Sequence, residues 1–448
     1  MYSTVLNYLK EKKYKSIHDL FMTMNEADIG ELFQKFYDEE DIQKHELIIL
    51  FRLLDKDVAA DVFSYMDVDS QMMLINLFTD KELQDVIDDL NMDDTVDMIE
   101  EMPANVVSRI LRNTDRNTRN QINQILKYPK DSAGAAMTTE YVYLKKDYTV
   151  KESIEKIRSI GMAKETVYTL YVTENRKLIG VLSILELITA DEDKLIKDIM
   201  ETNIISINTL DTEEDAANTL SKYDFIALPV VDKENRMVGI ITFDDVMDII
   251  QDNATEDFSK MSAVSPSEES YFKTPVIKHV KNRIVWLLVL MFSATITGMV
   301  INHYEAAFAT VPILVSFIPM LSGTGGNSGS QTSAVVIRGM AIGEIKLKDF
   351  FKVLFKEFRI AIVCSIILAI ANGIRILIMY KDWRLSVTVG GAIIATVIIA
   401  KLIACILPMA AKKLHLDPAV MAAPIITTIV DTCSIMVFFM IATVVFGL

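Results

Sequence analysis

The sequence has few of the residues that build most zinc and redox sites, with 3 cysteines and 5 histidines among 448 residues. Cys364, Cys405 and Cys433 all lie in apolar segments, where a free cysteine behaves as a small hydrophobic side chain. The histidines are scattered, and no Cys-x-x-Cys or Cys/His spacing typical of zinc sites occurs. We therefore expect no metal site built on cysteine or histidine.

Basic residues are in the minority, because 45 Lys and Arg stand against 61 Asp and Glu and the formal net charge is −16. Nucleic-acid binding needs clustered Lys and Arg against the phosphates, so this balance argues against a nucleic-acid partner. The sequence also lacks a Ser/His/Asp, Cys/His or phosphate-cradling constellation on any plausible strand-to-helix turn. We therefore do not expect an enzyme.

Charge and hydrophobicity are distributed unevenly about Val276. Residues 276–448 contain 15 Lys and Arg against 7 Asp and Glu, whereas the rest of the chain contains 30 against 54. With 51% hydrophobic residues overall, this division predicts an acidic soluble part joined to a basic, membrane-embedded part. An acidic surface suits multivalent cations, although most acidic proteins simply carry a solvated acidic surface.

Residues 1–130 are expected to form an all-α, superhelical N-terminal domain. Short apolar stripes recur there at helical spacing, and helices of this kind can stack so that each buries its face on the next. In the run DDLNMDDTVDMIEEMP, Asp93, Asp97 and Glu100 follow at i, i+4 and i+7 and share one helical face. A solvated helix face explains such a run, but a bound cation would relieve the repulsion between these like charges.

Residues 131–250 contain a tandem repeat with a period of about 60 residues. YTLYVTENRKLIGVLSILELI and FIALPVVDKENRMVGIITFDDVMDII each read as strand, turn at Glu-Asn-Arg, strand and helix, with Gly180 and Gly239 at equivalent positions. This β-α-β-β-α plan resembles a pair of CBS (cystathionine-β-synthase-type) domains. The resemblance implies an α/β regulatory module of a kind that often binds adenosine nucleotides, so ATP is a candidate ligand.

Acidic residues gather where the closing helix of the repeat leads toward the membrane part. Asp245 and Asp248 are one turn apart on this helix, and Glu256 and Asp257 lie further along it. Solvation explains many of these carboxylates. Carboxylates and water are also the ligands that Mg²⁺ selects, so a hard-cation site is an equal alternative.

Residues 251–281 are expected to form a connecting helix between the repeat and the membrane part. Ser-Pro at 265–266 and Thr-Pro at 274–275 should break or bend it. A stiff helix here could transmit motion from the repeat to a pore, and a passive tether is the alternative.

Residues 282–448 are expected to form an all-α membrane domain of five transmembrane helices. The five apolar runs begin at Ile284, Ala306, Phe358, Leu385 and Ala422. Each run approaches the roughly 20 residues needed to cross the hydrocarbon core. Basic residues precede the first run and fill the second and fourth loops, which predicts a cytoplasmic N-terminal part and an outside C-terminus in the cell membrane. The N-terminal stretch MYSTVLNYLKEKKYKS lacks the apolar core of a signal peptide, in keeping with this orientation.

The second run is irregular. It contains Pro312 and Pro319 and continues into SGTGGNSGSQTSAVVIRGMAIGE, where many glycines lie beside Asn327. This composition predicts non-helical backbone whose carbonyls could face a hydrated cation. A cytoplasmic re-entrant loop with no ligand role is the alternative.

The last run begins DPAVMAAPIITTIVDT and carries a single carboxylate, Asp431. A charge at membrane depth is costly and is kept where it faces a bundle interior or an aqueous path. Pro424 should free a backbone carbonyl about one turn earlier. Asp431 could line a cation pathway or pair with Arg375 or Lys401, and both interpretations stand at this point.

Together with the acidic helical part and the CBS-like repeat, the motifs GTGGNSGSQ and DPAVMAAPIITTIVD resemble the MgtE family of Mg²⁺ channels over nearly the whole chain. The resemblance implies a homodimer with five spans per subunit, a pore on the two-fold axis and negative feedback by cytosolic Mg²⁺. It places Asp431 at the family's pore aspartate, with Gly326, Asn327 and Gly329 nearby. The residues it implies for regulatory Mg²⁺ are Asp93, Asp97, Glu214, Asp224, Asp245, Asp248, Glu256, Asp257 and Asp417.

The sequence departs from the family's pattern at two positions. Ala423 stands where some members carry a polar residue of the pore lining, and Thr212 lacks a carboxylate that others use in a regulatory site. A transporter for Mn²⁺ or Co²⁺ and a membrane Mg²⁺ sensor that does not transport are the alternative functions.

Overall fold

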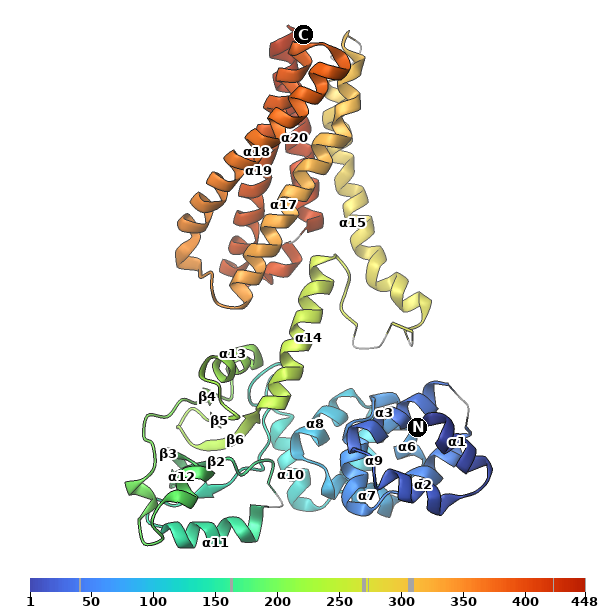
Figure 1. The fold of residues 1–448 in the computed structure, drawn as a ribbon, viewed down its shortest axis with the longest axis vertical. Helices are drawn as coiled ribbons and strands as arrows, with labels where there is room; N and C mark the ends of the chain where they lie inside the picture. Colours follow the sequence, from blue (N-terminus) through green and yellow to red (C-terminus); the bar gives the residue numbers. More distant parts are fainter. Residues whose placement is uncertain are drawn as a thin grey trace. The chain divides into compact units, whose positions relative to one another are not determined.

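The computed structural model describes residues 1–39, 42–161, 164–267, 271–272, 274–304, 310–421 and 423–447. The chain divides into two compact units, Met1–Ile250 and Gln251–Leu448. Among the described residues, strands occur in the first unit alone (Figure 1).

The first unit begins with ten short helices. They are α1 (Tyr2–Lys10), α2 (Tyr14–Phe21), α3 (Glu26–Asp38), α4 (Lys44–Phe51), α5 (Lys56–Ser64), α6 (Val68–Leu77), α7 (Asp80–Asp89), α8 (Met92–Glu101), α9 (Ala104–Asn113) and α10 (Arg116–Ile125). Polar side chains cap the N-termini of several of these helices. Thr79, for example, forms a capping box with Glu82 at the start of α7. Alternate helices pack together, α3 on α5, α5 on α7 and α7 on α9. The predicted superhelical array is therefore confirmed.

The tandem repeat forms two similar three-stranded sheets. Their elements are β1 (Tyr143–Leu144), α11 (Val150–Ile160), β2 (Thr169–Glu174), β3 (Lys177–Ser183) and α12 (Ile184–Thr189), then β4 (Ile207–Asn208), α13 (Glu213–Tyr223), β5 (Ala227–Val231), β6 (Met237–Thr242) and α14 (Phe243–Met261). In each sheet the first strand is parallel and the third antiparallel to the central one. Gly180 lies opposite Val172 and Gly239 opposite Val230, so the repeat inferred from sequence is a repeat of structure. A Cβ atom on Gly239 would lie 2.6 Å from the Thr138 carbonyl oxygen, which explains the glycine.

Helix α14 begins in the repeat and extends past Ile250 to Met261, and the described residues between it and α15 are not helical. Ala263 takes a left-handed conformation with φ 55° just beyond the end of α14. Pro275 is the N-cap of α15, a position where its missing N–H costs no hydrogen bond. The segment 251–281 therefore holds the end of one helix and the start of another.

All the regular elements described in the second unit are helices. Its elements are the end of α14, then α15 (Val276–His303), η3 (Pro312–Phe317), α17 (Ile318–Ala341), η4 (Leu347–Asp349), α18 (Phe350–Tyr380), α19 (Trp383–Lys413), η5 (Pro418–Met421) and α20 (Ala423–Phe446). Within the described part of the chain, four segments are long and apolar enough to span a membrane: Val276–His303, Leu347–Tyr380, Trp383–Lys413 and Pro418–Phe446. The fifth long helix, α17, is richer in glycine and hydroxyl side chains and packs against both α19 and α20 (Figure 1).

The prediction of a broken backbone in the second run is wrong. The whole glycine-rich stretch lies inside the continuous helix α17. Pro424 likewise lies in the first turn of α20, where no helical hydrogen bond is lost, so it frees no carbonyl within the helix. The early residues of the second run, 305–309, lie outside the described residues.

Candidate ion pathway and cation-sensing site

The glycines of α17 allow close packing of helices. A Cβ atom on Gly325 would lie 2.7 Å from Val430 Cγ1 of α20 and 2.8 Å from Thr396 Cγ2 of α19. One on Gly329 would lie 2.8 Å from Ile426 Cγ2. Small residues let membrane helices approach one another in this way. Gly326 and Gly329 therefore lie buried against neighbouring helices, inside the continuous helix α17.

Replacement of Gly325 by alanine is expected to destabilise the protein by about 1–3 kcal/mol, because the added methyl group overpacks the α17–α19–α20 contact. Gly323 lies in the same helix with nothing within 4 Å of its Cβ position, so Gly323→Ala is the matched control. Thermal unfolding of the purified protein in detergent should show a lower melting temperature for Gly325→Ala only. Equal melting temperatures for the two variants would contradict this packing.

A polar stripe lies on the opposite, exposed side of α17. Gly323, Asn327 and Gln331 follow at i, i+4 and i+8, and all three are exposed. Of the three residues predicted to accompany Asp431 in a pore, Asn327 alone lies on this open face. An exposed amide pair on a helix packed between apolar helices is suited to a hydrated path.

Asp431 lies on α20, which packs against α17. Ser322 hydrogen-bonds to its carboxylate, while the buried Oδ1 has no hydrogen-bond partner in the described part of the chain. Thr432, the next residue, shares a 2.8 Å hydrogen bond with Thr297 of α15. The side chain of Ala423, the departure expected to affect this lining, lies outside the described side chains.

Asp431 pairs with neither Lys401 nor Arg375, the two basic residues that the sequence offered as partners. Lys401 instead interacts with Glu357 and Thr332, and Arg375 donates to Met320 Sδ at 3.4 Å. Sequence reasoning missed Glu357, because it stands among Lys352, Lys356 and Arg359 and reads as part of a basic loop. It also missed Ser322, since a serine near a helix start carries no distinctive signal.

An acidic cluster joins α8 to the start of α14 and to a loop of the first CBS repeat. We define it as Asp93, Asp94, Asp97, Glu140, Glu165, Asp244 and Asp245, whose charges act on one another. Asp93 is only 8% exposed, so it does not lie on the solvated helix face that the sequence allowed. Asp245 is held by Thr242, whose hydroxyl donates to Oδ2 at 2.5 Å. Glu140 and Glu165 could not be found from sequence, because only the tertiary fold brings these loop residues to α8.

Carboxyl groups of the acidic cluster have raised pKa values. Loss of hydration, followed by the charge of Asp245, raises the pKa of Asp97 to about 7 and that of Asp94 to about 6. The same causes raise the pKa of Glu165 to about 7 and that of Asp93 well above its ordinary value. Glu165 Oε2 is buried without a hydrogen-bond partner among the described atoms. The cluster is thus short of positive charge, which either protons or cations would supply.

The donor chemistry of the acidic cluster fits Mg²⁺. Mg²⁺ binds carboxylate oxygen and usually keeps several waters, so one or two carboxylates for each ion suffice. Among the described residues, no three His, Cys, Asp or Glu side chains form a ready-made metal cage. A site of one or two carboxylates with water is the arrangement that these residues allow.

A second acidic group lies in the other unit, where α14 ends. Lys260 Nζ lies 2.6 Å from Asp417 Oδ2 and 2.7 Å from Glu256 Oε1. Burial, followed by the charge of Asp417, raises the pKa of Asp257. The structure thus brings together Glu256, Asp257 and Asp417, as expected of a shared site, but it also places the Lys260 ammonium among them.

The remaining predicted ligands lie on or beside other elements. Glu214 is in the first turn of α13, and Asp224 ends that helix in a left-handed conformation with φ 53°. Asp248 is exposed on α14, where its charge acts on Asp245. Thr212 caps α13 by accepting a 3.1 Å hydrogen bond from the Asp215 amide, so it serves the helix.

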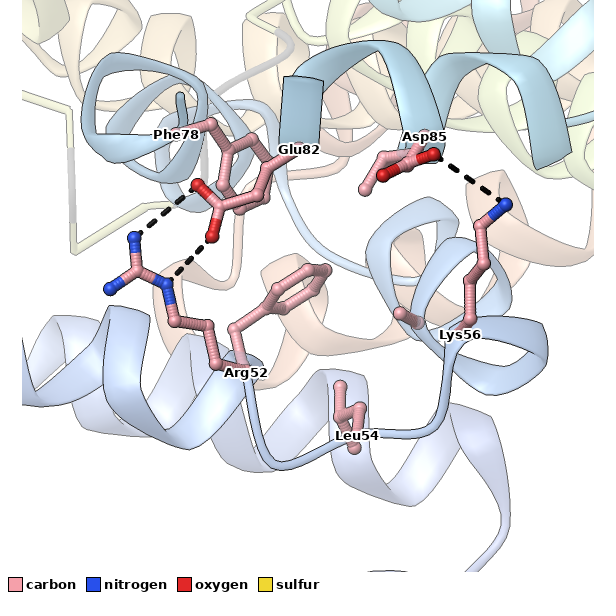
Figure 2. A pocket seen from close by; sticks show the side chains of 9 residues that line it. Arg52, Leu54, Lys56, Phe78, Glu82 and Asp85 are labelled. Carbon is pink, nitrogen blue, oxygen red and sulfur yellow. Dashed lines mark hydrogen bonds and ion pairs between the residues drawn. The ribbon is translucent and has the colours of Figure 1, made fainter. Parts of the chain in front are cut away.

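A small pocket of about 130 Å³ lies elsewhere in the helical array, between the turn after α4 and helices α5 and α7. Figure 2 shows Arg52 facing Glu82 across it, at 2.7 Å, and Lys56 facing Asp85 at 3.6 Å. Because each cation there lies opposite a carboxylate, the pocket lacks the charge imbalance of the acidic cluster.

The chain matches three kinds of family model. They are a divalent cation transporter over residues 318–441, an MgtE intracellular N domain over 24–131 and CBS domains over 133–193 and 196–252. The magnesium transporter MgtE of Bacillus subtilis (strain 168) is 32% identical over 421 residues, covering 90% of this chain and 92% of that protein. The magnesium transporter MgtE of Enterococcus faecalis (strain ATCC 700802 / V583) is 30% identical over 449 residues, covering 99% and 96%.

Solved structures resemble the first unit. A cytosolic domain of the Mg²⁺ channel MgtE in complex with ATP aligns with a TM-score of 0.51 at 29% identity, covering 56% of this chain and 100% of that chain. The soluble part of a magnesium transporter aligns with a TM-score of 0.52 at 28% identity, covering 56% and 98%.

Proposed function

The chain belongs to the MgtE family of divalent cation transporters, and from this premise we propose that it carries Mg²⁺ across the cell membrane and closes when cytosolic Mg²⁺ rises. The observation that carries the proposal is the Asp431 carboxylate, whose buried Oδ1 has no hydrogen-bond partner among the described residues, on a helix that packs against α17. The magnesium transporters that align over nearly the whole chain support the choice of ion.

The proposed pathway follows α17 and α20. Mg²⁺ gives up its water reluctantly, so a pathway can recognise the hydrated ion through a carboxylate and amide oxygens in its outer shell. Asp431 supplies the charge and Asn327 the amide, while Ser322 fixes the carboxylate. Gly326 and Gly329 contribute by letting α20 approach α17.

A homodimer would place two Asp431 carboxylates across a two-fold axis. Helix α15 supports this arrangement, because none of its residues is buried within its own chain. Its exposed apolar face, which includes Phe292 and Met299, suits lipid or a second copy. The N-terminal part would be cytoplasmic and the C-terminus outside, following the basic loops.

Feedback is assigned to the two acidic groups. The carboxylates of the acidic cluster repel one another, so the compact arrangement of α8 on the CBS pair is costly without a counter-charge. Regulatory Mg²⁺, when bound, would supply that counter-charge. Asp93, Asp97, Asp245 and Asp248 would hold it in the first unit, and Glu256, Asp257 and Asp417 at the end of α14. Glu214 and Asp224 stay proposed ligands on α13. Compaction would then act on the pathway through α14.

ATP is a further proposed ligand of the CBS pair. The support is the aligned cytosolic domain, which was solved in complex with ATP. Calorimetric titration of the purified protein with ATP tests this binding.

Without Mg²⁺, the protein is expected to lose stability as the pH rises from about 4 to about 7. Asp97 has a pKa of about 7 when folded against 3.8 ordinarily, so the folded state binds its proton more tightly than the unfolded chain does. The resulting penalty is absent below the ordinary pKa, grows between the two values and is complete above about pH 7. Thermal unfolding in EDTA should therefore show a falling melting temperature, and added Mg²⁺ should cancel most of the fall. A melting temperature independent of pH and Mg²⁺ would contradict the charge deficit of the cluster.

Uptake into proteoliposomes tests the proposed function itself. A Mg²⁺-sensitive dye inside the vesicles should report uptake, and Mn²⁺ and Co²⁺ are added outside as competitors. Uptake of Mg²⁺ with weak competition supports the proposal. Preferred uptake of Mn²⁺ or Co²⁺ would make the chain a transporter of another divalent ion, and absent uptake with intact Mg²⁺-dependent stabilisation would make it a sensor.

A further inference from the structure

Three polar side chains from three membrane helices meet behind the proposed pathway. Thr332 of α17 donates a 3.0 Å hydrogen bond to Glu357 Oε2 of α18 and accepts a 2.9 Å hydrogen bond from Lys401 Nζ of α19. The Lys401 ammonium lies 3.7 Å from Glu357 Oε2. The side chains of Lys401 and Glu357 are only 8% and 12% exposed.

Both charges lie well inside their helices. Lys401 precedes the end of α19 at Lys413 by about 18 Å, and Glu357 follows the start of α18 at Phe350 by about 10 Å, at 1.5 Å per residue. Neither position allows the buried side chain to reach the membrane surface freely. Removing one member of a buried pair leaves an uncompensated charge in a low-dielectric environment.

The pair lies directly against the helix that carries the polar stripe. Ala400, the residue before Lys401, has its carbonyl oxygen 3.7 Å from the Cβ position of Gly329, and Thr332 is one turn further along α17. The cation therefore adjoins the inner side of α17, while Asn327 lies on the exposed side. A lysine charge at this place acts on a divalent ion through protein, where charges are weakly screened.

We propose that Glu357 is the counter-charge that cancels Lys401, so that the pathway along α17 stays attractive to a divalent cation. This inference rests on the proposed transport function. Glu357 is a positioning and charge-balancing residue, because it acts through Lys401 and does not touch the ion. Lys401 contacts Glu357 and Thr332, and it forms no ion pair with Asp431 among the described residues.

The test is the half-saturating Mg²⁺ concentration for uptake into proteoliposomes. Glu357→Gln keeps the shape and a hydrogen-bonding oxygen but leaves Lys401 unpaired, so the half-saturating concentration should rise about tenfold or more. The double variant Glu357→Gln with Lys401→Met removes both charges and should return to within about threefold of wild type. Glu357→Asp, which keeps the charge, should also stay within about threefold. Arg375→Met, at another membrane cation, is the matched control and should leave the value unchanged.

If Thr332, Glu357 and Lys401 had a purely structural role, the half-saturating concentrations of the variants would rank differently. The double variant would then be at least as impaired as Glu357→Gln, because it loses more of the hydrogen bonds. That order, or a normal half-saturating concentration in Glu357→Gln, would overturn the proposal. If Glu357→Gln is not recovered folded, the neutral double variant decides, and its failure to fold or to transport overturns the proposal as well. Absent uptake by the wild-type protein would count against transport itself and would remove the basis of both proposals.

Discussion

Replacement of Asp431 by asparagine is expected to reduce Mg²⁺ uptake by about two orders of magnitude or more, because it removes the carboxylate that supplies the charge of the proposed pathway. Asparagine has nearly the same shape and can still accept the hydrogen bond from Ser322, so the fold should be retained. A loss of uptake in Asp431→Asn would therefore report the loss of the negative charge at this position. Asp431→Glu restores the charge on a longer side chain and should recover part of the uptake.

The matched control is Asp382→Asn at the N-cap of α19. Asp382 accepts hydrogen bonds from the amides of Arg384 and Leu385, a role that asparagine performs about equally well. Its uptake should match wild type. Uptake within about tenfold of wild type in Asp431→Asn, in folded protein, would remove Asp431 from the pathway.

Combined replacement of Asp93 and Asp245 by asparagine should raise the Mg²⁺ concentration that inhibits uptake from the cytoplasmic side by about tenfold or more. The two residues lie on α8 and α14, and the negative charge of each raises the free energy needed to ionise the other. Amide oxygen is a weaker ligand for Mg²⁺ than carboxylate, so the compact state gains less from the ion. Uptake at low cytoplasmic Mg²⁺ should remain, because neither residue lies in the membrane unit.

Asp191→Asn provides the control for this second experiment. Asp191 is a carboxylate of the same unit with a side chain 81% exposed, and it pairs only with Lys194 at 3.2 Å among the described residues. Its inhibition curve should coincide with that of wild type. An unchanged curve in the Asp93 and Asp245 variant would mean that the cluster does not sense Mg²⁺.

Lys260 changes how the second acidic group can work. Its ammonium lies 2.6 Å from Asp417 and 2.7 Å from Glu256, two of the carboxylates that we propose as ligands of regulatory Mg²⁺. Mg²⁺ binding there would require Lys260 to move away. The end of α14 therefore carries its own cation, which links Asp417 to α14 without any metal.

The sequence predicted features that depend on local pattern. The match between Gly180 and Gly239 correctly identified two equivalent strand pairs, because the repeat preserves both period and register. Asp431 stood out for a similar reason, since a lone carboxylate in an apolar run is visible without a structure. The apolar stripes of the first 130 residues likewise contained enough helical periodicity to predict the array.

Other features depend on contacts that no local pattern records. The glycines around Gly325 suggested a broken chain, since glycine weakens isolated helices, yet here they let three helices pack. Asp93 looked like part of a solvated face, but the CBS pair and neighbouring helices bury it. Glu357 and Glu165 gained their roles only when distant segments met.

Transport with feedback is tested most directly by Mg²⁺ uptake by the wild-type protein in proteoliposomes. The first unit of the protein should face a compartment whose Mg²⁺ concentration is clamped. We expect rapid uptake when that compartment holds only trace Mg²⁺. Uptake should be strongly suppressed at about 10 mM Mg²⁺, a concentration at which carboxylate sites of weak affinity fill. Uptake that is absent at trace Mg²⁺, or that continues unchanged at the high concentration, would contradict transport with feedback.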